Sequence, residues 1–328
     1  MSAPAPLLSI RDLKVHFKLA SDSPLPWAAP RWLKAVDGVS FDIFPGETLG
    51  VVGESGCGKS TLARAMLNLI PATSGSIVWQ GQEMHGATAD AWQDIRKSVQ
   101  MIFQDPLASL NPRMTIGQII AEPLRTHFPR MDAKEVMCKV RAMMVQVGLT
   151  EQQINRYPHE FSGGQCQRIG IARALVLEPK LVICDEPVSA LDVSIQAQII
   201  NLLQELQAKM GLALVFIAHD LAVVKHISQR VMVMYLGRAM ELADKNAIYR
   251  HPGHPYTQAL LSAIPLPDPR RERNKTLQLL QGDLPSPMNP PSGCSFRTRC
   301  PKAEPGCAQQ APQLRALSPE TRVACLLA

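Results

Sequence analysis

Residues 53–61 read GESGCGKST, which matches the phosphate-binding pattern G-x-x-x-x-G-K-[ST] at every fixed position. Residues 49–52 before it predict a buried strand and residues 62–67 after it predict a helix, so a glycine-rich turn without a ligand is disfavoured. Glycines let the backbone N–H groups turn towards phosphate, and the helix N-terminus adds a positive dipole. Lys59 would supply a charge to the phosphates and Ser60 a hydroxyl to Mg²⁺. The pattern predicts a nucleoside triphosphate site made by Gly53, Glu54, Ser55, Gly56, Cys57, Gly58, Lys59, Ser60 and Thr61.

Length and composition predict a globular protein of about two domains, because a chain of 328 residues can bury a large core. The sequence has no apolar run of the length that a membrane span needs, and its N-terminus lacks a basic segment followed by an apolar core. We therefore expect a cytoplasmic chain. Its net charge of +6 is spread without a long basic run and only 5% of residues are aromatic, which disfavours a nucleic-acid partner.

Hydrophobic patterning divides the chain into an α/β layer and a helical insertion. We expect helices at Thr115–Leu124 and Asp132–Val147, the second with Asp132 and Glu135 in capping-box spacing, inside a helical subdomain of about residues 105–165. A proline-rich loop is expected at Ala20–Arg31. We expect a further helix at Ile195–Met210. The strands that we expect are Leu7–Phe17, Val39–Phe44, Glu47–Val52, Ile77–Gln80, Leu181–Cys184, Leu212–Ala218 and, as the last strand, Val231–Tyr235.

A shift to a proline-rich and cysteine-rich composition predicts a domain boundary near Ile264. The predicted domains are therefore residues 1–263 and residues 264–328, and the second is called the C-terminal lobe below. 

A second glycine pair follows at residues 161–165, which read FSGGQ and precede an apolar helix pattern. Ser162 is a natural N-cap there, and a helix start with exposed N–H groups is a second anion site. The residues that we assign to it are Ser162, Gly163, Gly164 and Gln165.

Two carboxylates close the strand pattern of residues 181–184. Open α/β sheets bind ligands at the carboxyl ends of their strands, so Asp185 and Glu186 are candidates for the reaction centre. Asp185 would hold Mg²⁺ through water, and Glu186 would polarise the attacking water as the catalytic base. 

Together these three motifs resemble the ATP-binding cassette (ABC) family, although Phe161 stands where its signature usually has Leu. The resemblance implies a P-loop NTPase nucleotide-binding domain with a RecA-like α/β core, a β subdomain and the helical insertion. It also implies that Gln104 senses Mg²⁺ and the γ-phosphate, that the loop ending at Asp192 crosses to a partner subunit, and that His219 is the γ-phosphate switch. Phe17 matches the aromatic residue that stacks on adenine. Lys59, Gln104, Glu186 and His219 would form the catalytic set, with ATP and Mg²⁺ as cofactors.

Two further segments resemble the ATPase subunits of bacterial oligopeptide and dipeptide importers: residues 104–113, QDPLASLNPR, and residues 251–261, HPGHPYTQALL. The resemblance implies an ATP sandwich with a second, unlike ATPase subunit. It also implies two transmembrane permease subunits, which residues 107–115 would touch, and an indirect partner in a periplasmic peptide-binding protein. Such a chain lies at the cytoplasmic face of the inner membrane. Import of nickel or another solute stays open, as does, with less support, a soluble ABC ATPase that acts on nucleic acid.

The C-terminal lobe contains four of the eight cysteines, separated by five, six and seventeen residues. These gaps are wider than the paired spacing of structural zinc sites. Four thiolates suit a [4Fe–4S] cluster, which the resemblance also implies for some importer subunits, and free thiols are the alternative. The candidate ligands are Cys294, Cys300, Cys307 and Cys325.

Overall fold

The computed structural model describes residues 5–19, 31–265, 268–275 and 277–328. The described residues form two compact units: unit 1 contains those within 5–6, 43–48 and 86–217, and unit 2 contains those within 7–19, 31–42, 49–85 and 218–328. The proline-rich loop expected at Ala20–Arg31 lies outside the described residues, except for Arg31, which begins a strand.

Unit 1 is built on three parallel strands, β6 (Val99–Ile102), β7 (Leu181–Asp185) and β8 (Ala213–Ile217). Each residue of β7 and β8 is buried, as expected for strands covered on both faces. Helices α2 (Ala89–Ser98) and α7 (Val193–Met210) belong to the same unit, and we did not predict α2.

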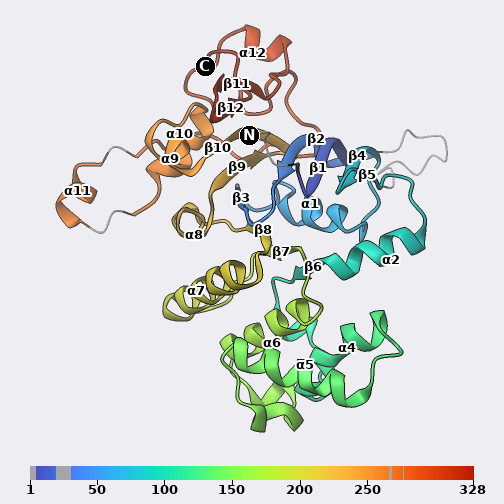
Figure 1. Ribbon diagram of the computed structural model, residues 1–328. Helices are drawn as coiled ribbons and strands as arrows, with labels where there is room; N and C mark the ends of the chain where they lie inside the picture. Colours follow the sequence, from blue (N-terminus) through green and yellow to red (C-terminus); the bar gives the residue numbers. More distant parts are fainter. Residues whose placement is uncertain (1–4, 20–30, 266–267, 276) are drawn as a thin grey trace. The chain divides into compact units, whose positions relative to one another are not determined.

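The remaining helices of unit 1 form the predicted helical insertion (Figure 1). In α4 (Ile116–His127), Thr115 and Gln118 form a capping box. The cap of α5 (Ala133–Gln146) differs from our expectation: Asp132 accepts a hydrogen bond from the N–H of Lys134, two residues on, and Glu135 takes no part in it. The other members are α3 (Pro106–Ser109), the 3-10 turns η1 (Glu151–Asn155) and η2 (Pro158–Glu160), and α6 (Gly163–Leu175).

Unit 2 contains an antiparallel sheet with the strand order β2-β1-β4-β5. Strand β1 (Leu8–Leu19) fully buries Ile10 and Leu13, which are three residues apart because a register shift between Arg11 and Lys14 interrupts the alternation of its faces. Strand β2 (Arg31–Ile43) begins eight residues earlier than the predicted Val39, because the sequence before Val39 lacks a clear apolar alternation. The shorter strands are β4 (Ser74–Trp79) and β5 (Gln82–Glu83).

Five further strands of unit 2 follow the order β11-β12-β10-β9-β3. Strand β3 (Thr48–Val52), whose first residue belongs to unit 1, pairs in parallel with β9 (Arg230–Tyr235), and the others pair antiparallel. Our prediction that Val231–Tyr235 is the last strand is wrong, because β10 (Arg238–Asp244), β11 (Arg315–Ser318) and β12 (Thr321–Val323) come after it. The C-terminal lobe thus contributes β12 directly to a sheet through its pairing with β10.

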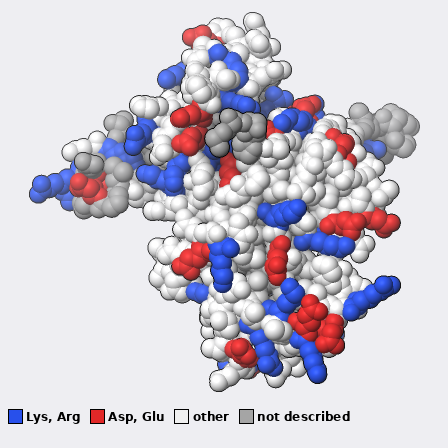
Figure 2. Space-filling view, in the orientation of Figure 1, with Lys and Arg blue, Asp and Glu red and all other residues white. Residues whose placement is uncertain are grey.

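The helices of unit 2 are short. They are α1 (Lys59–Met66), α8 (Leu221–Ile227), α9 (Lys245–Arg250), α10 (Pro255–Ser262), α11 (Pro269–Arg273) and α12 (Gly306–Gln309). No helix in the described part of the chain has both the length and the apolar composition to cross a membrane. On the face drawn in Figure 2, basic and acidic side chains are interspersed.

Candidate functional site

The loop between β3 and α1 has the conformation that residues 53–61 predict. Gly58 has a φ of 101°, and a Cβ there would lie 2.0 Å from the carbonyl oxygen of Ala35. Gly53 is equally confined, because its Cβ would lie 2.2 Å from the carbonyl oxygen of Met234. Only glycine fits at these two positions, so the backbone is held in a tight arch that ends at the first turn of α1.

Lys59 lies inside this arch. Its side chain is buried, and its Nζ donates hydrogen bonds to the carbonyl oxygens of Gly53, at 2.8 Å, and Glu54, at 3.1 Å. Cys57 is also buried, and burial raises the pKa of its thiol although the charge of Lys59 opposes this. A positive charge at the start of a helix, enclosed by a glycine loop, fits a bound triphosphate.

The loop is also tied to distant parts of unit 2. The N–H of Glu54 donates to the hydroxyl of Tyr256, at 3.0 Å, and the Glu54 carboxylate pairs with Arg299. We did not predict either contact. Tyr256 lies in residues 251–261, which the sequence had singled out, but nothing local marks Arg299, which is 245 residues from Glu54.

In unit 1 the two carboxylates lie where the strand pattern placed them. Asp185 is the last residue of β7 and is 2% exposed. Glu186 follows with a φ of 46°, a conformation that is unusual outside glycine and is often found at functional sites. The Nε2 of Gln104 donates to the Oε2 of Glu186 at 3.0 Å, so these two predicted residues do come together.

The second glycine segment is also formed as expected. Ser162 is the N-cap of α6: its Oγ accepts from the N–H of Gln165, and the Gln165 side chain accepts from the N–H of Ser162, which completes a capping box. Ser162 and Gly163 are exposed, so this helix start is accessible. Asp192 is exposed as well, at the N-cap of α7.

Phe17 and His219 complete the predicted set, and both belong to unit 2. Phe17 is half-buried near the end of β1. His219 is exposed and follows Ala218, whose N–H donates to the carbonyl oxygen of Val51 in β3. His219 therefore directly follows a residue that is hydrogen-bonded to the strand before the phosphate loop.

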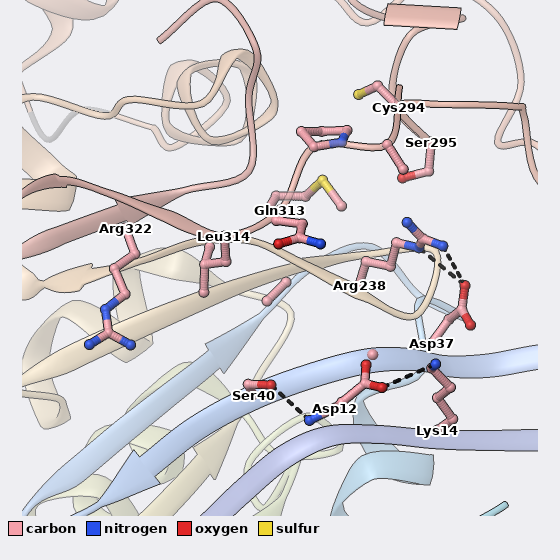
Figure 3. A pocket seen from close by; sticks show the side chains of 15 residues that line it. Asp12, Lys14, Asp37, Ser40, Arg238, Cys294, Ser295, Gln313, Leu314 and Arg322 are labelled. Carbon is pink, nitrogen blue, oxygen red and sulfur yellow. Dashed lines mark hydrogen bonds and ion pairs between the residues drawn. The ribbon is translucent and has the colours of Figure 1, made fainter. Parts of the chain in front are cut away.

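A polar cavity of about 450 Å³ also opens in unit 2, and none of its lining residues belongs to the phosphate loop (Figure 3). Asp37 lines it and is bound by Arg238, at 2.7 Å, and by His16, at 3.0 Å. Burial raises the pKa of Asp37, but these partners outweigh burial and leave the pKa below its ordinary value. The ion pair fastens β2 to β10, and we assign this cavity no ligand.

The four cysteines of the C-terminal lobe are free thiols, and Cys294 and Cys307 are buried. Burial raises the pKa of Cys294, and the neighbouring Cys307, Cys300 and Cys325 raise it further. In the described ranges, however, no set of three or more His, Cys, Asp or Glu side chains is arranged to hold a metal ion. As placed, these side chains do not fit an iron–sulfur cluster.

Comparison with known proteins gives two family models. The model described as "ABC transporter" matches residues 36–189, and "Oligopeptide/dipeptide transporter, C-terminal region" matches residues 240–307. The oligopeptide transport ATP-binding protein OppF of Salmonella typhimurium is 66% identical over 94% of this chain and 92% of the relative. OppF of Escherichia coli is 67% identical over the same shares, and AppF of Bacillus subtilis is 52% identical over 98% and 97%.

Solved structures agree on the fold. A dimeric ATP-binding cassette in a post-hydrolysis state, bound to ADP and Pi, has a TM-score of 0.64 at 24% identity, over 73% of this chain and 98% of that chain. The protein cbiO1 of Clostridium perfringens, part of an ABC transporter complex, has a TM-score of 0.64 at 26% identity, over 75% and 91%. 

Proposed function

Since this chain belongs to the family of OppF-type ATP-binding subunits of ABC oligopeptide transporters, we propose that it hydrolyses ATP to drive the import of oligopeptides. The observation that carries the proposal is the glycine arch around the buried Lys59, in a chain 66% identical to such a subunit over 94% of its length. 

We propose that the phosphate loop binds the ATP phosphates through its N–H groups and Lys59, with Phe17 against the adenine. Ser60 lies in the first turn of α1, where its hydroxyl can serve Mg²⁺. Asp185 would be the second ligand of Mg²⁺, acting through water, and Gln104 would be the third. Mg²⁺ is commonly held by one or two carboxylates and by substrate phosphates, so it does not need a dedicated protein cage.

For hydrolysis we assign Glu186 as the base that orients the attacking water. The hydrogen bond from Gln104 fixes the Glu186 carboxylate, and the unusual backbone conformation directs it from the end of β7. His219 would contact the γ-phosphate. In phosphoryl transfer the protein contributes mainly positioning and charge stabilisation, which is what these side chains can supply.

We propose that the complete site needs two chains. The phosphate loop of one chain would face the exposed Ser162–Gln165 segment of a second, unlike ATPase subunit, and Asp192 would lie at the same interface. The accessible helix start of α6 supports this, because its exposed N–H groups can bind the phosphates of a nucleotide that is held by the other chain.

The membrane partners are assigned to residues 107–115. Leu107 in α3 is 54% exposed, which suits burial against another protein. Arg173 anchors this segment from within unit 1 by donating to the carbonyl oxygen of Ser109. We propose that two permease subunits dock here and hold the chain at the cytoplasmic face of the inner membrane, with a periplasmic peptide-binding protein as an indirect partner.

A [4Fe–4S] cluster on Cys294, Cys300, Cys307 and Cys325 stays a proposal that rests on the donor chemistry and the family resemblance, and it requires the thiols to reorient. Iron and sulfide analysis after anaerobic purification tests it. About four irons per chain would support the cluster, and iron-free, fully stable protein would leave four free thiols.

Import of nickel or another solute is the second candidate, because subunits outside this chain select the solute. The proposed function is tested by uptake of labelled di-, tri- and pentapeptides in cells that lack only this chain, complemented with the wild type or Glu186→Gln. We expect only the wild type to restore peptide uptake. Unchanged uptake of every peptide would contradict peptide import and favour another solute.

A further inference from the structure

Glu54, the second residue of the phosphate loop, is held at three separate points. Lys59 binds its carbonyl oxygen, Tyr256 accepts from its N–H, and Arg299 pairs with its carboxylate. The first contact is internal to the loop, whereas the other two come from residues 202 and 245 positions away. The conformation of the loop therefore depends on the C-terminal part of unit 2.

A buried network of hydrogen bonds holds Tyr256 in place. Tyr256 lies at the start of α10, where the Nδ1 of His254 accepts from its N–H at 3.0 Å. His254 and Gly253 in turn donate their N–H groups to the carboxylate of the fully buried Glu241. Because this network is buried, the Tyr256 hydroxyl has a fixed position towards Glu54.

Arg299 reaches Glu54 from the C-terminal lobe. Its Nη1 and Nη2 donate to the two carboxylate oxygens at 2.7 Å and 3.1 Å, which is the bidentate geometry of strong Arg–carboxylate pairs. The Arg299 side chain is 9% exposed and lies over the ring of Tyr235. That ring packs edge-on against Tyr256 and Phe296, so both contacts to Glu54 arise from one aromatic cluster.

The negative charge of Glu54 explains why such contacts are useful for phosphate binding. A carboxylate in a phosphate loop repels the polyanion that the loop has to bind. Arg299 neutralises this carboxylate and holds it to one side, while Tyr256 fixes the peptide group of the same residue. A loop that is already ordered loses less conformational entropy when its ligand binds.

We propose that Arg299 and Tyr256 are positioning residues for the ATP site, so that the C-terminal region of this transporter subunit sets the affinity of its own phosphate loop. This inference rests on the proposed function, because it requires that the loop binds ATP. 

The test is the Kd of Mg·ATP for the full-length chain, titrated with a fluorescent ATP analogue, with the thermal midpoint of unfolding measured on each variant. Arg299→Met should weaken binding about tenfold, the change expected for one lost charge-assisted contact. Tyr256→Phe, which removes only the hydroxyl, should weaken it about fivefold. The matched control is Arg297→Met, two residues away. The hydrogen bonds seen for the Arg297 guanidinium go to Ser292, within the C-terminal lobe.

The decisive variant is Arg299→Met combined with Glu54→Gln. If Arg299 acts by neutralising Glu54, removing the carboxylate as well should recover most of the lost affinity, whereas a structural defect would persist. Should Arg299→Met fail to fold, Arg299→Gln, which removes the charge but keeps a polar side chain, serves in its place. Wild-type affinity in folded Arg299 and Tyr256 variants, or additive losses in the double variant, would overturn this inference alone. A wild-type chain that binds no ATP would overturn the proposed function with it.

Discussion

The two glycine segments of the chain are built in opposite ways. The phosphate loop is held from outside: Gly53, Cys57 and Lys59 are buried, and groups from distant parts of unit 2 hold its second residue, while Ser55 and Gly56 at its tip are exposed. The segment Ser162–Gln165 is open, and the capping bonds that we see there are made within the segment itself. 

The roles that we propose for the two segments account for this difference. A loop that captures ATP on a single chain gains from being ordered in advance, because ordering it on binding would cost affinity. A helix start that meets nucleotide on a partner chain has to stay accessible until that chain arrives. Binding and turnover should therefore be separable by mutation.

Lys59→Ala attacks the phosphate loop and should have the largest effect. Loss of the buried ammonium removes the charge that we assign to the phosphates, so ATP turnover by the assembled transporter should fall by about 10³-fold. Phosphate release measures this, with Lys209→Ala on the solvent side of α7 as the control. Turnover near that of the wild type would contradict the assignment of the loop.

Glu186→Gln should separate ATP binding from ATP hydrolysis. Removal of a general base costs about 10²–10⁴-fold in turnover, while ATP affinity should stay close to that of the wild type. The amide can still interact with Gln104, so the backbone at Glu186 should keep its conformation. Retained turnover would show that another group activates the water.

Gly163→Asp tests the open segment. A Cβ at Gly163 would meet only Leu191, at an ordinary 3.7 Å, so the variant should fold. The new carboxylate would repel the partner's ATP, and turnover in the assembled transporter should fall about 10²-fold while the isolated chain still binds ATP normally. Gly164→Ala is a poor substitute, since its Cβ would lie 2.6 Å from Ile195. Loss of ATP binding by isolated Gly163→Asp would contradict the separation.

The smallest expected effect concerns His254, which belongs to the buried network that holds Tyr256. Burial lowers the pKa of His254 to about 4, below the value of about 6.5 in the unfolded chain. The unfolded state then binds more protons between these values, so this contribution to stability is present above pH 6.5 and is lost as the pH falls towards 4. Between pH 7.5 and pH 5 the loss should be about 2 kcal/mol.

His254→Asn, which keeps a capping acceptor, isolates this contribution, because Glu241 stays in place in both proteins. The pKa of Glu241 is raised by burial, which favours the folded state at low pH and partly offsets the histidine. Urea unfolding at the two pH values should show a smaller acid loss in His254→Asn. Equal losses would mean that His254 titrates normally.

Local sequence patterns predicted much of this molecule. The strand, loop and helix around residues 53–61, the N-cap at Ser162 and the buried strand before Asp185 are confirmed, because each depends on residues close together in the chain. The ABC cassette fold is confirmed as well. 

Long-range pairing could not be predicted in the same way. Strand β10 has no simple alternation, because the fully buried Glu241 interrupts its apolar pattern, and its pairing with β12 joins segments about 80 residues apart. The pair Glu54–Arg299 joins two polar residues that both read as ordinary surface groups. The grouping of four cysteines suggested a metal, but side-chain orientation, which no sequence pattern encodes, decides whether thiols converge.

The most direct test of the account compares ATP binding and ATP turnover in the isolated chain with those in the chain plus its partner ATPase and permease subunits. We predict that the isolated chain binds ATP but hydrolyses it slowly, and that turnover rises when the partner subunits are added. Fast turnover by the isolated chain that does not depend on its concentration would contradict the account, because it would mean that one chain forms a complete site.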